Sequence, residues 1–138
     1  LNYFYSAAYQ VELFEFADGR EWLRQDLLDR VVTPGTINND SISGDHLVDR
    51  VFGFAGNDTL RGDAGADYFV FSGKGFGNDV IEDFDYGLGD RIKFAAGGSF
   101  TDLSFAADGD DTIVTYFNAS IRLVGLSPDE VAEPFFLF

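Results

Sequence analysis

Aspartates recur at a fixed spacing in the middle of the chain, and their chemistry is that of calcium ligands. Asp40, Asp49, Asp58 and Asp67 are nine residues apart, and glycines precede them at the same interval. Calcium takes six to eight oxygen ligands, which carboxylates and backbone carbonyls both supply. Glycine at the first and fourth positions of a turn can adopt positive φ and turn its carbonyls inward, while the aspartate at position six closes the site. The spacing therefore predicts a row of calcium-binding turns.

The repeat also predicts the fold that positions these aspartates. Its four consecutive nonapeptides, over residues 35–70, are GTINNDSIS, GDHLVDRVF, GFAGNDTLR and GDAGADYFV. A period of nine suits a solenoid in which a six-residue turn precedes a three-residue strand, with two units in each coil. The eighth residue of each unit then points inward, which assigns the interior to Ile42, Val51, Leu60 and Phe69. We predict an all-β parallel β-roll with two stacked sheets.

Alternate units of such a roll stack on the same edge, so an ion should lie between one turn and the turn two units later. The bridging pairs are predicted to be Asp40 with Asp58, Asp49 with Asp67, and Asp58 with Asp79. Asp79 belongs to a fifth unit, residues 74–82, which follows an insertion at 71–73. Two neighbouring carboxylates repel each other in a partly desolvated site. We therefore expect the array to fold poorly without metal.

The segments on either side of the array are predicted to cap the roll. Residues 1–34 are assigned to an N-terminal cap, residues 35–82 to the roll, and residues 83–138 to a C-terminal cap. Solenoids need caps because an end coil otherwise exposes its core and an unpaired backbone edge.

Local patterns give these caps their expected elements. In the N-terminal cap we expect strands over 11–16 and 21–23 around a turn at Asp18-Gly19, and then a short helix over 23–31. In the C-terminal cap we expect antiparallel strands over 91–94, 103–105, 112–117 and 120–124, and a helix start at 127–130.

Composition limits the classes of partner. The chain has 24 acidic and 9 basic residues and a formal charge of -15, so it would repel nucleic acid and anionic membranes, whereas bound cations would relieve its self-repulsion. It has no cysteine, which excludes disulfides and thiolate zinc sites. No apolar run approaches the roughly 18 residues of a membrane span. Because it starts at Leu1 without a signal-peptide pattern, we interpret it as a piece of a larger protein.

Catalytic motifs are not found. The sequence contains neither HExxH nor GxSxG, and its single histidine, His46, falls at an outward turn position. Paired carboxylates for glycoside hydrolysis can be nominated almost anywhere in so acidic a chain, which makes such a nomination uninformative. We expect no enzymatic activity from these residues.

The array and three further segments resemble the RTX (repeat-in-toxin) family, whose consensus repeat is G-G-x-G-x-D-x-U-x. FEFADGREW is similar to the segment between RTX arrays, and IRLVGLSPDEVAEPFFLF to the C-terminal end of type I secretion substrates. DYFVFSGKGFGNDVIEDFDYGLGDRIKF is similar to the end of the array in serralysin-type metalloproteases, lipases and alginate epimerases. The resemblance implies a calcium-binding C-terminal domain of an exported bacterial protein.

The resemblance also implies a ligand set of about three calcium ions. In the family, one turn gives the carbonyls of positions two and four, and the turn two units later gives those of positions one and three. Carried onto this chain, the first site comprises Thr36, Asn38, Asp40, Gly53, Ala55 and Asp58. The second comprises Asp45, Leu47, Asp49, Gly62, Ala64 and Asp67, and the third Phe54, Gly56, Asp58 and Asp79. A left-handed conformation suits Asn38 but would strain Leu47. Asp83, Asp85 and Asp90 follow the array, either in a terminal site or on the surface.

Two functions remain open. The first is a secreted, extracellular module that folds on binding Ca²⁺ outside the cell, carries a type I secretion signal and supports upstream domains of its parent. The second is a surface adhesion or glycan-binding module in which calcium is structural. The terminal Phe135-Phe136-Leu137-Phe138 is interpreted as part of the export signal, the alternative being the end of a buried strand.

Overall fold

The computed structural model describes residues 2–5, 11–15, 21–23 and 32–138. The chain divides into two compact units, Leu1–Val31 and Val32–Phe138. In the described part of the chain, no helix is long and apolar enough to cross a membrane.

The first unit contains an antiparallel sheet of three strands. Strand β2 (Val11–Glu15) pairs with β1 (Asn2–Tyr5) on one side and with β3 (Glu21–Leu23) on the other. The two predicted strands are confirmed, whereas β1 was not predicted. The expected turn at Asp18-Gly19 and residues 24–31 of the expected helix lie outside the described residues.

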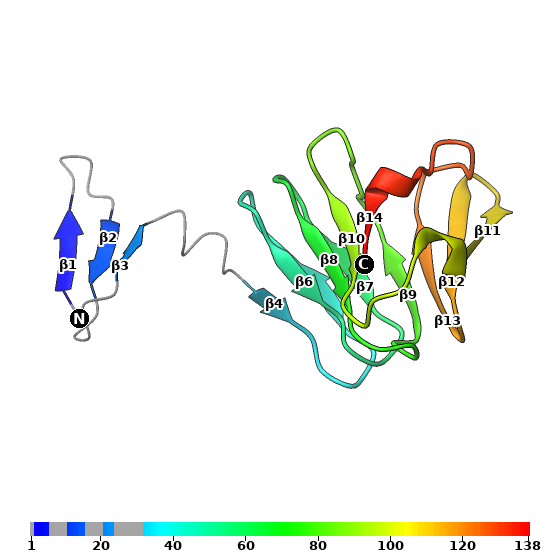
Figure 1. Cartoon of the computed structure of the whole chain (residues 1–138), viewed down its shortest axis with the longest axis horizontal. Coiled ribbons are helices and arrows are strands. Elements are labelled where there is room, and N and C mark those ends of the chain that lie inside the picture. Colours follow the sequence, from blue (N-terminus) through cyan, green and yellow to red (C-terminus); the bar gives the residue numbers. More distant parts are fainter. Residues whose placement is uncertain (1, 6–10, 16–20, 24–31) are drawn as a thin grey trace. The chain divides into compact units, whose positions relative to one another are not determined.

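The second unit consists of two sheets, and from β4 to β10 the chain passes from one sheet to the other at each turn (Figure 1). The five-stranded sheet is entirely parallel and has the order β14 (Phe136–Leu137), β10 (Arg91–Phe94), β8 (Tyr68–Phe71), β6 (Arg50–Phe52) and β4 (Val32–Pro34). The six-stranded sheet has the order β11 (Leu103–Asp108), β12 (Asp111–Tyr116), β13 (Ala119–Leu123), β9 (Asn78–Ile81), β7 (Thr59–Arg61) and β5 (Ser41–Ser43). The all-β fold with parallel sheets is therefore as predicted.

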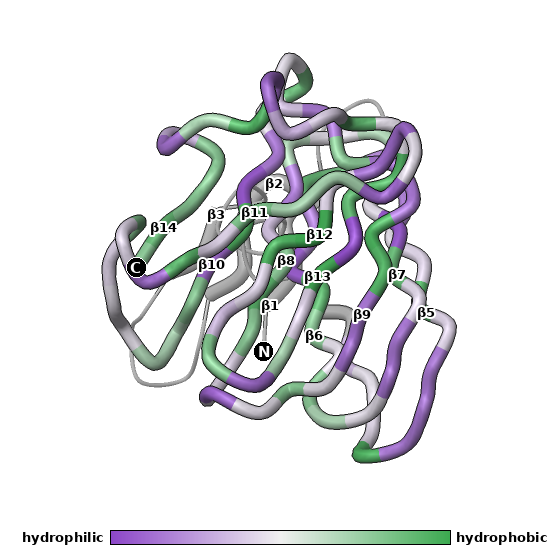
Figure 2. Tube along the Cα trace, turned by 90° about the vertical axis from the view of Figure 1, so that its right-hand side faces the viewer, coloured by the Kyte–Doolittle hydropathy of each residue, from purple (hydrophilic) through white to green (hydrophobic). Residues whose placement is uncertain are grey.

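The core follows from the three-residue strands of the repeat. The strand pattern of one apolar residue between two more polar ones buries the central side chain, and Figure 2 shows such hydrophobic centres along β5 and β7. The predicted interior residues Ile42, Val51, Leu60 and Phe69 are all buried. Ile81, which is in register with Leu60, and Ile92, which is in register with Phe69, continue the buried interior.

The C-terminal residues extend both sheets. Strands β11, β12 and β13 form the predicted antiparallel meander, and β13 joins the roll by pairing in parallel with β9. The prediction that residues 91–94 belong to this antiparallel cap is wrong, because β10 pairs in parallel with β8 and continues the roll. At the same end the core becomes aromatic: the ring of Phe94 lies 4.5 Å from that of Tyr116 and 6.3 Å from that of Phe136. These large side chains fill the space between the sheets beyond the last turns.

The helix predicted at 127–130 is instead a single turn. The backbone N–H and hydroxyl of Ser127 donate to Oε2 of Glu130 at 2.9 and 2.8 Å, as at a helix start. The chain then continues to a 3-10 turn, η2 (Glu133–Phe135), which contains Pro134 in its first positions. In residues 32–138 the only other helical segment is the 3-10 turn η1 (Phe100–Asp102).

Candidate metal centre

The aspartates of the first edge form a ladder from turn to turn. The backbone N–H of Asp40 donates to Oδ1 of Asp58 at 2.8 Å, and the N–H of Asp58 donates to Oδ1 of Asp79 at 2.8 Å. Backbone hydrogen bonds from Thr59 to the Asp40 carbonyl and from Val80 to the Asp58 carbonyl, each of 2.8 Å, fix the spacing of the turns. The structure thus brings together the predicted pairs Asp40 with Asp58 and Asp58 with Asp79.

The second edge carries the same ladder and extends it. The N–H of Asp49 donates to Oδ1 of Asp67 at 2.8 Å, and the N–H of Asp67 donates to Oδ1 of Asp90 at 2.9 Å. Asp90 therefore occupies the aspartate column, although it lies beyond the insertion. Its signal in the sequence is an aspartate two residues before a buried apolar residue, Ile92. Because the spacing of nine had been lost, the sequence left open whether Asp90 belongs to a terminal site or to the surface.

Three of these carboxylates are left with a buried oxygen that has no partner. The side chains of Asp58, Asp67 and Asp79 are 1%, 0% and 2% exposed, and Oδ2 of each accepts no hydrogen bond in the structure. A buried charged oxygen without a partner is strongly unfavourable unless a cation balances it. All three atoms therefore fit a metal ion between the turns.

In each of the other aspartates of the ladder, Oδ2 accepts a hydrogen bond from a backbone N–H of its own turn. Oδ2 of Asp40 accepts from the N–H of Thr36 at 2.6 Å, and Oδ2 of Asp49 accepts from the N–H of Asp45 at 2.7 Å. Oδ2 of Asp90 accepts from the N–H of Asp85 at 2.9 Å. Among the described residues, the unpaired oxygens thus belong to the middle aspartate of each edge, Asp58 and Asp67, and to Asp79, the last aspartate of the first edge.

The turn conformation corrects the prediction about glycine. Positive φ occurs at position four, at Gly56 (128°) and Gly65 (143°), but not at position one. It occurs instead at position two, at Phe54 (70°) and Asp63 (63°). The position-one glycines leave room for the carboxylate of their own turn. A Cβ on Gly53 would lie 2.3 Å from Oδ2 of Asp58, and a Cβ on Gly62 would lie 2.3 Å from Oδ2 of Asp67.

The first two turns have a different backbone from the later ones. Neither Asn38 nor Leu47 has positive φ, so the strain expected at Leu47 does not arise. Their carbonyl oxygens nevertheless face the turn two units later. A Cβ placed on Gly56 would lie 2.4 Å from the carbonyl oxygen of Asn38, and one placed on Gly65 would lie 2.0 Å from that of Leu47.

Carbonyls from the following turns face back into the same spaces. A Cβ on Gly35 would lie 2.6 Å from the carbonyl oxygen of Gly53, and one on Gly44 would lie 2.7 Å from that of Gly62. The space between successive turns is therefore bounded by main-chain oxygens as well as carboxylates. The other residues nominated as ligands lie in the same turns and are Thr36, Asp45, Phe54, Ala55 and Ala64.

Asp83 and Asp85 have other contacts. The carboxylate of Asp83 accepts from the N–H of Gly62 at 3.0 Å and from that of Asp63 at 2.8 Å, so both of its oxygens are occupied. Oδ1 of Asp85 accepts from the N–H of Gly87 at 2.8 Å within its own loop. His46 is exposed in its turn.

Burial changes the acidity of the unpaired carboxylates. Desolvation raises the pKa of Asp79 to about 7 and that of Asp67 to about 6, against the opposing effect of the backbone hydrogen bonds. Desolvation likewise raises the pKa of Asp58 and of Asp90. Neighbouring aspartates add to each rise. Without a cation, these carboxylates bind protons far more readily than exposed aspartates do.

The ligand chemistry favours calcium. In the described residues, no three His, Cys, Asp or Glu side chains converge as a metal site, so side chains alone do not form one. Two carboxylates supplemented by backbone carbonyls make an all-oxygen site, which suits a hard cation of high coordination number rather than zinc. The residues present therefore fit Ca²⁺.

Comparison with known proteins finds a family model and solved structures that match parts of the chain. Residues 1–26 match the model of the haemolysin-type calcium binding protein related domain. A search of curated proteins finds no match. Among solved structures, the chain is similar to the extracellular lipase LipA from Serratia marcescens, with a TM-score of 0.55 and 20% identity over 78% of this chain and 20% of the lipase. This chain therefore spans about a fifth of that enzyme, and the likeness concerns the fold.

A second solved structure is the AlgE6R3 subunit of the mannuronan C5-epimerase from Azotobacter vinelandii. Its TM-score is 0.37, with 25% identity over 78% of this chain and 79% of that subunit.

Proposed function

We propose that the chain is a calcium-binding RTX module of the β-roll type, and that it is non-catalytic and folds when it binds Ca²⁺ outside the cell. The observation that carries this proposal is the set of buried, unpaired Oδ2 atoms on Asp58, Asp67 and Asp79. A divalent cation bound at each of them would neutralise charge that otherwise opposes the stacking of the turns.

Calcium would act as a folding ligand in this proposal. Asp58 would serve the ions on both sides of its turn, since it contacts Asp40 below and Asp79 above. Asp67 would do the same between Asp49 and Asp90, which makes a fourth bridging pair in addition to the three predicted from the sequence. The carbonyls of Asn38, Leu47, Gly53 and Gly62, which face the spaces between the turns, would complete the oxygen ligands.

Calcium-dependent folding would suit a protein that is exported unfolded. Extracellular calcium modules bind with dissociation constants of about 10⁻⁴ to 10⁻³ M, so they are empty in the cytosol and loaded outside. With a net charge of -15 the metal-free chain repels itself and stays extended enough to pass through a type I export channel. The loaded roll would then support the folding of upstream domains in the parent protein.

The C-terminal tail has a structural role that is compatible with export. Phe135 and Phe136 are buried, and β14 pairs in parallel with β10, so the tail ends a strand of the folded roll. Before calcium binds, this apolar segment would be exposed behind an acidic stretch, as an export signal requires. We propose that the tail is read by the type I machinery first and is buried afterwards.

A calcium titration tests the proposal. Far-UV circular dichroism of the 138-residue chain should show a cooperative gain of β signal at millimolar Ca²⁺, and none with Mg²⁺, which prefers a smaller octahedral site. Asp58→Ala and Asp67→Ala should weaken the response most, since each of these side chains serves two sites. A chain that is fully folded in excess chelator, with no change on adding Ca²⁺, would contradict the proposal.

A further inference from the structure

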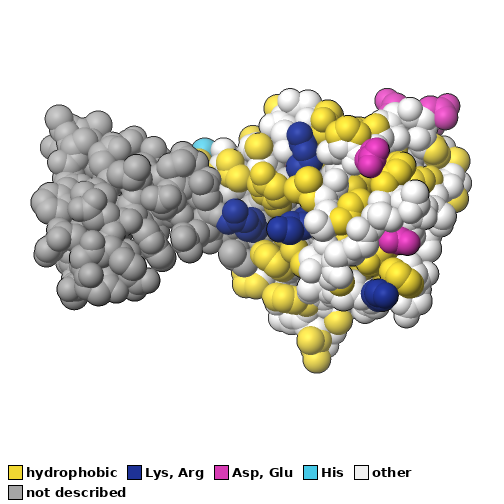
Figure 3. All heavy atoms as spheres, viewed as in Figure 1, with side chains coloured by type: hydrophobic (Ala, Val, Ile, Leu, Met, Phe, Trp, Pro, Cys, Tyr) yellow, Lys and Arg dark blue, Asp and Glu magenta, His cyan; other side chains and the backbone are white. Residues whose placement is uncertain are grey.

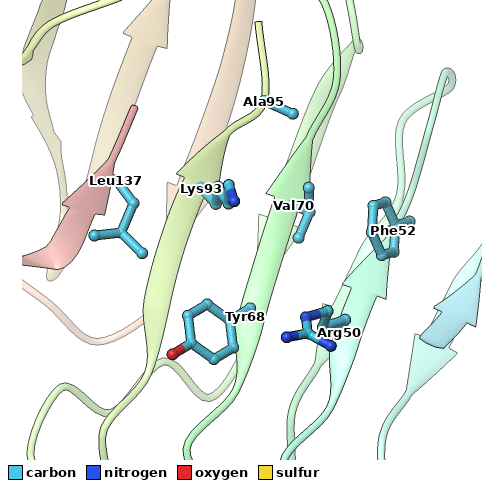
Figure 4. Close-up of a pocket in the computed structure, with 7 residues that line it drawn as sticks. All are labelled: Arg50, Phe52, Tyr68, Val70, Lys93, Ala95 and Leu137. Carbon is cyan, nitrogen blue, oxygen red and sulfur yellow. The ribbon is translucent and has the colours of Figure 1, made fainter. Parts of the chain in front are cut away.

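A shallow groove of about 350 Å³ crosses the outward face of the five-stranded sheet. Its walls come from β6, β8, β10 and β14, whose side chains project from the same side of the sheet (Figure 4). The residues that matter for its chemistry are Arg50, Phe52, Tyr68, Val70, Lys93 and Leu137. None of them belongs to the calcium ligands discussed above, so the groove requires its own explanation.

The groove is basic although the molecule is strongly acidic. In residues 34–138, the ion pairs of arginine involve Arg61 and Arg122, both on the six-stranded sheet. Arg50 and Lys93 form no ion pair with the residues that the structure describes. On the face shown in Figure 3, Lys and Arg side chains lie among hydrophobic side chains. An anionic ligand is therefore the complement of this surface.

Flat apolar surfaces lie beside these cations. The guanidinium of Arg50 lies 5.8 Å from the ring centre of Tyr68, and Phe52 lies on the same strand as Arg50. Lys93 is in register with Val70 on one side and with Leu137 on the other, so one row of side chains crosses the strands. Neighbouring strands are about 4.8 Å apart, a spacing comparable with the width of a sugar ring.

Phe54 extends the apolar surface at a conformational cost. It has a φ of 70°, which is unfavourable for a bulky residue and would cost a glycine nothing. Its side chain is 41% exposed, and its ring stacks on that of Phe52 with centres 5.8 Å apart. Strained residues that persist often serve a binding function. Because Phe54 belongs to the turn that ends at Asp58, the metal-dependent turn also positions this ring.

We propose that the groove binds an acidic polysaccharide, in a calcium-dependent manner. Arg50 and Lys93 pair with the carboxylates of the chain, and the rings of Phe52 and Phe54 lie against its sugar rings. An acidic peptide or an anionic lipid surface would be attracted by the same charges, but it has no flat apolar ring to place against the stacked rings of Phe52 and Phe54. This ligand goes beyond the calcium-dependent folding proposed above.

Binding can be measured by isothermal titration of the full chain in saturating Ca²⁺. The probe is a hexasaccharide of galacturonate, and the neutral galactose hexasaccharide is its matched control. Arg50→Gln and Lys93→Gln should each weaken the galacturonate complex about tenfold, since each removes one charge-assisted hydrogen bond. Arg122→Gln changes the net charge equally on the opposite sheet and should change the affinity by less than about twofold. Circular dichroism verifies that each variant still folds with Ca²⁺.

Phe54→Gly separates a binding role from a structural one. Removing the backbone strain at residue 54 should let the turn bind Ca²⁺ at a lower Ca²⁺ concentration. Loss of the ring should weaken hexasaccharide binding roughly threefold to tenfold. No detectable binding by the calcium-loaded chain would overturn the proposal. Equal losses in Lys93→Gln and Arg122→Gln, equal binding of the neutral sugar, or equally tight binding of polyglutamate or anionic vesicles would also do so. These results leave the calcium titration of the preceding section unaffected.

Discussion

Replacing Asp79 by asparagine should stabilise the metal-free protein and at the same time remove much of its response to calcium. The side chain is 2% exposed, its Oδ1 accepts a 2.8 Å hydrogen bond from the N–H of Asp58, and its Oδ2 has no partner. Asparagine has nearly the same shape and keeps an oxygen for the Asp58 N–H. It lacks the negative charge that burial makes unfavourable and that calcium requires.

The magnitude follows from the pKa of Asp79. Burial raises it from 3.8 to about 7, or about three pKa units. At 1.36 kcal/mol per unit, the ionised carboxylate destabilises the metal-free fold by about 4 kcal/mol above pH 8. The asparagine amide offsets part of the gain, because a buried N–H group without a partner costs about 1 to 3 kcal/mol. The variant should therefore be about 1 to 3 kcal/mol more stable than the wild type in chelator.

In the presence of Ca²⁺ we expect the wild type to be more stable than the Asp79→Asn variant. A ligand at about one hundred times its dissociation constant stabilises the fold by about 2.7 kcal/mol per site, and the variant loses this gain where Asp79 is a ligand. Urea denaturation followed by far-UV circular dichroism at pH 8.5 measures both conditions, with sucrose added to the chelator samples so that a folded fraction is measurable. Asp110→Asn, at an exposed turn residue, is the control for the change in net charge.

Two outcomes would refute this reasoning. If Asp79→Asn is less stable than the wild type in chelator, the buried charge is not the obstacle to metal-free folding. If Ca²⁺ stabilises the variant as much as the wild type, Asp79 is not a ligand.

Other perturbations give further predictions. Because the pKa values of Asp67 and Asp79 are raised to about 6 and about 7, protonation of these carboxylates favours the metal-free fold. The stability of the metal-free fold should be greatest near pH 4 and should be lost as the pH rises to 8. A pH series of circular dichroism in chelator tests this, and stability that does not fall as the pH rises would contradict it. Gly77→Ala should cost about 3 kcal/mol, since its Cβ would lie 1.6 Å from a carbonyl oxygen of the preceding turn. Gly75→Ala, whose Cβ meets nothing closer than 3.6 Å, should cost less than about 0.5 kcal/mol, and equal costs in urea denaturation would contradict the steric explanation. Phe136→Ala should lower the stability of the calcium-loaded roll by about 3 to 5 kcal/mol, and a change below about 1 kcal/mol would mean that the tail is not part of the core.

The repeat made the roll predictable, because each strand needs only one apolar residue in a fixed place after the turn. The interior column and three bridging aspartate pairs followed directly from that regularity. Asp90 was left open between a terminal site and the surface because the loop before it differs in length from the repeat, although its relation to Ile92 is the same as that of Asp67 to Phe69. A search for an aspartate two residues before an apolar residue, without fixed spacing, would have found it.

Details of the turns were less accessible from sequence. Glycine at position one was expected to supply positive φ, but it supplies space for the carboxylate of its own turn, as between Gly53 and Asp58. The left-handed residue is Phe54, a type that sequence rules exclude from that conformation. The conformation of one turn depends on its contacts with the turns above and below, and a local pattern does not contain them. The same holds for β14, whose pairing with β10 joins residues far apart in the chain.

The most direct measurement is a crystal structure of the chain grown with Ca²⁺, with anomalous difference density used to locate the ions. Peaks should lie between successive turns, within about 2.3 to 2.6 Å of Oδ2 of Asp58, Asp67 and Asp79. Peaks confined to exposed carboxylates, with these three oxygens still lacking any partner, would contradict the assignment of the buried aspartates as calcium ligands.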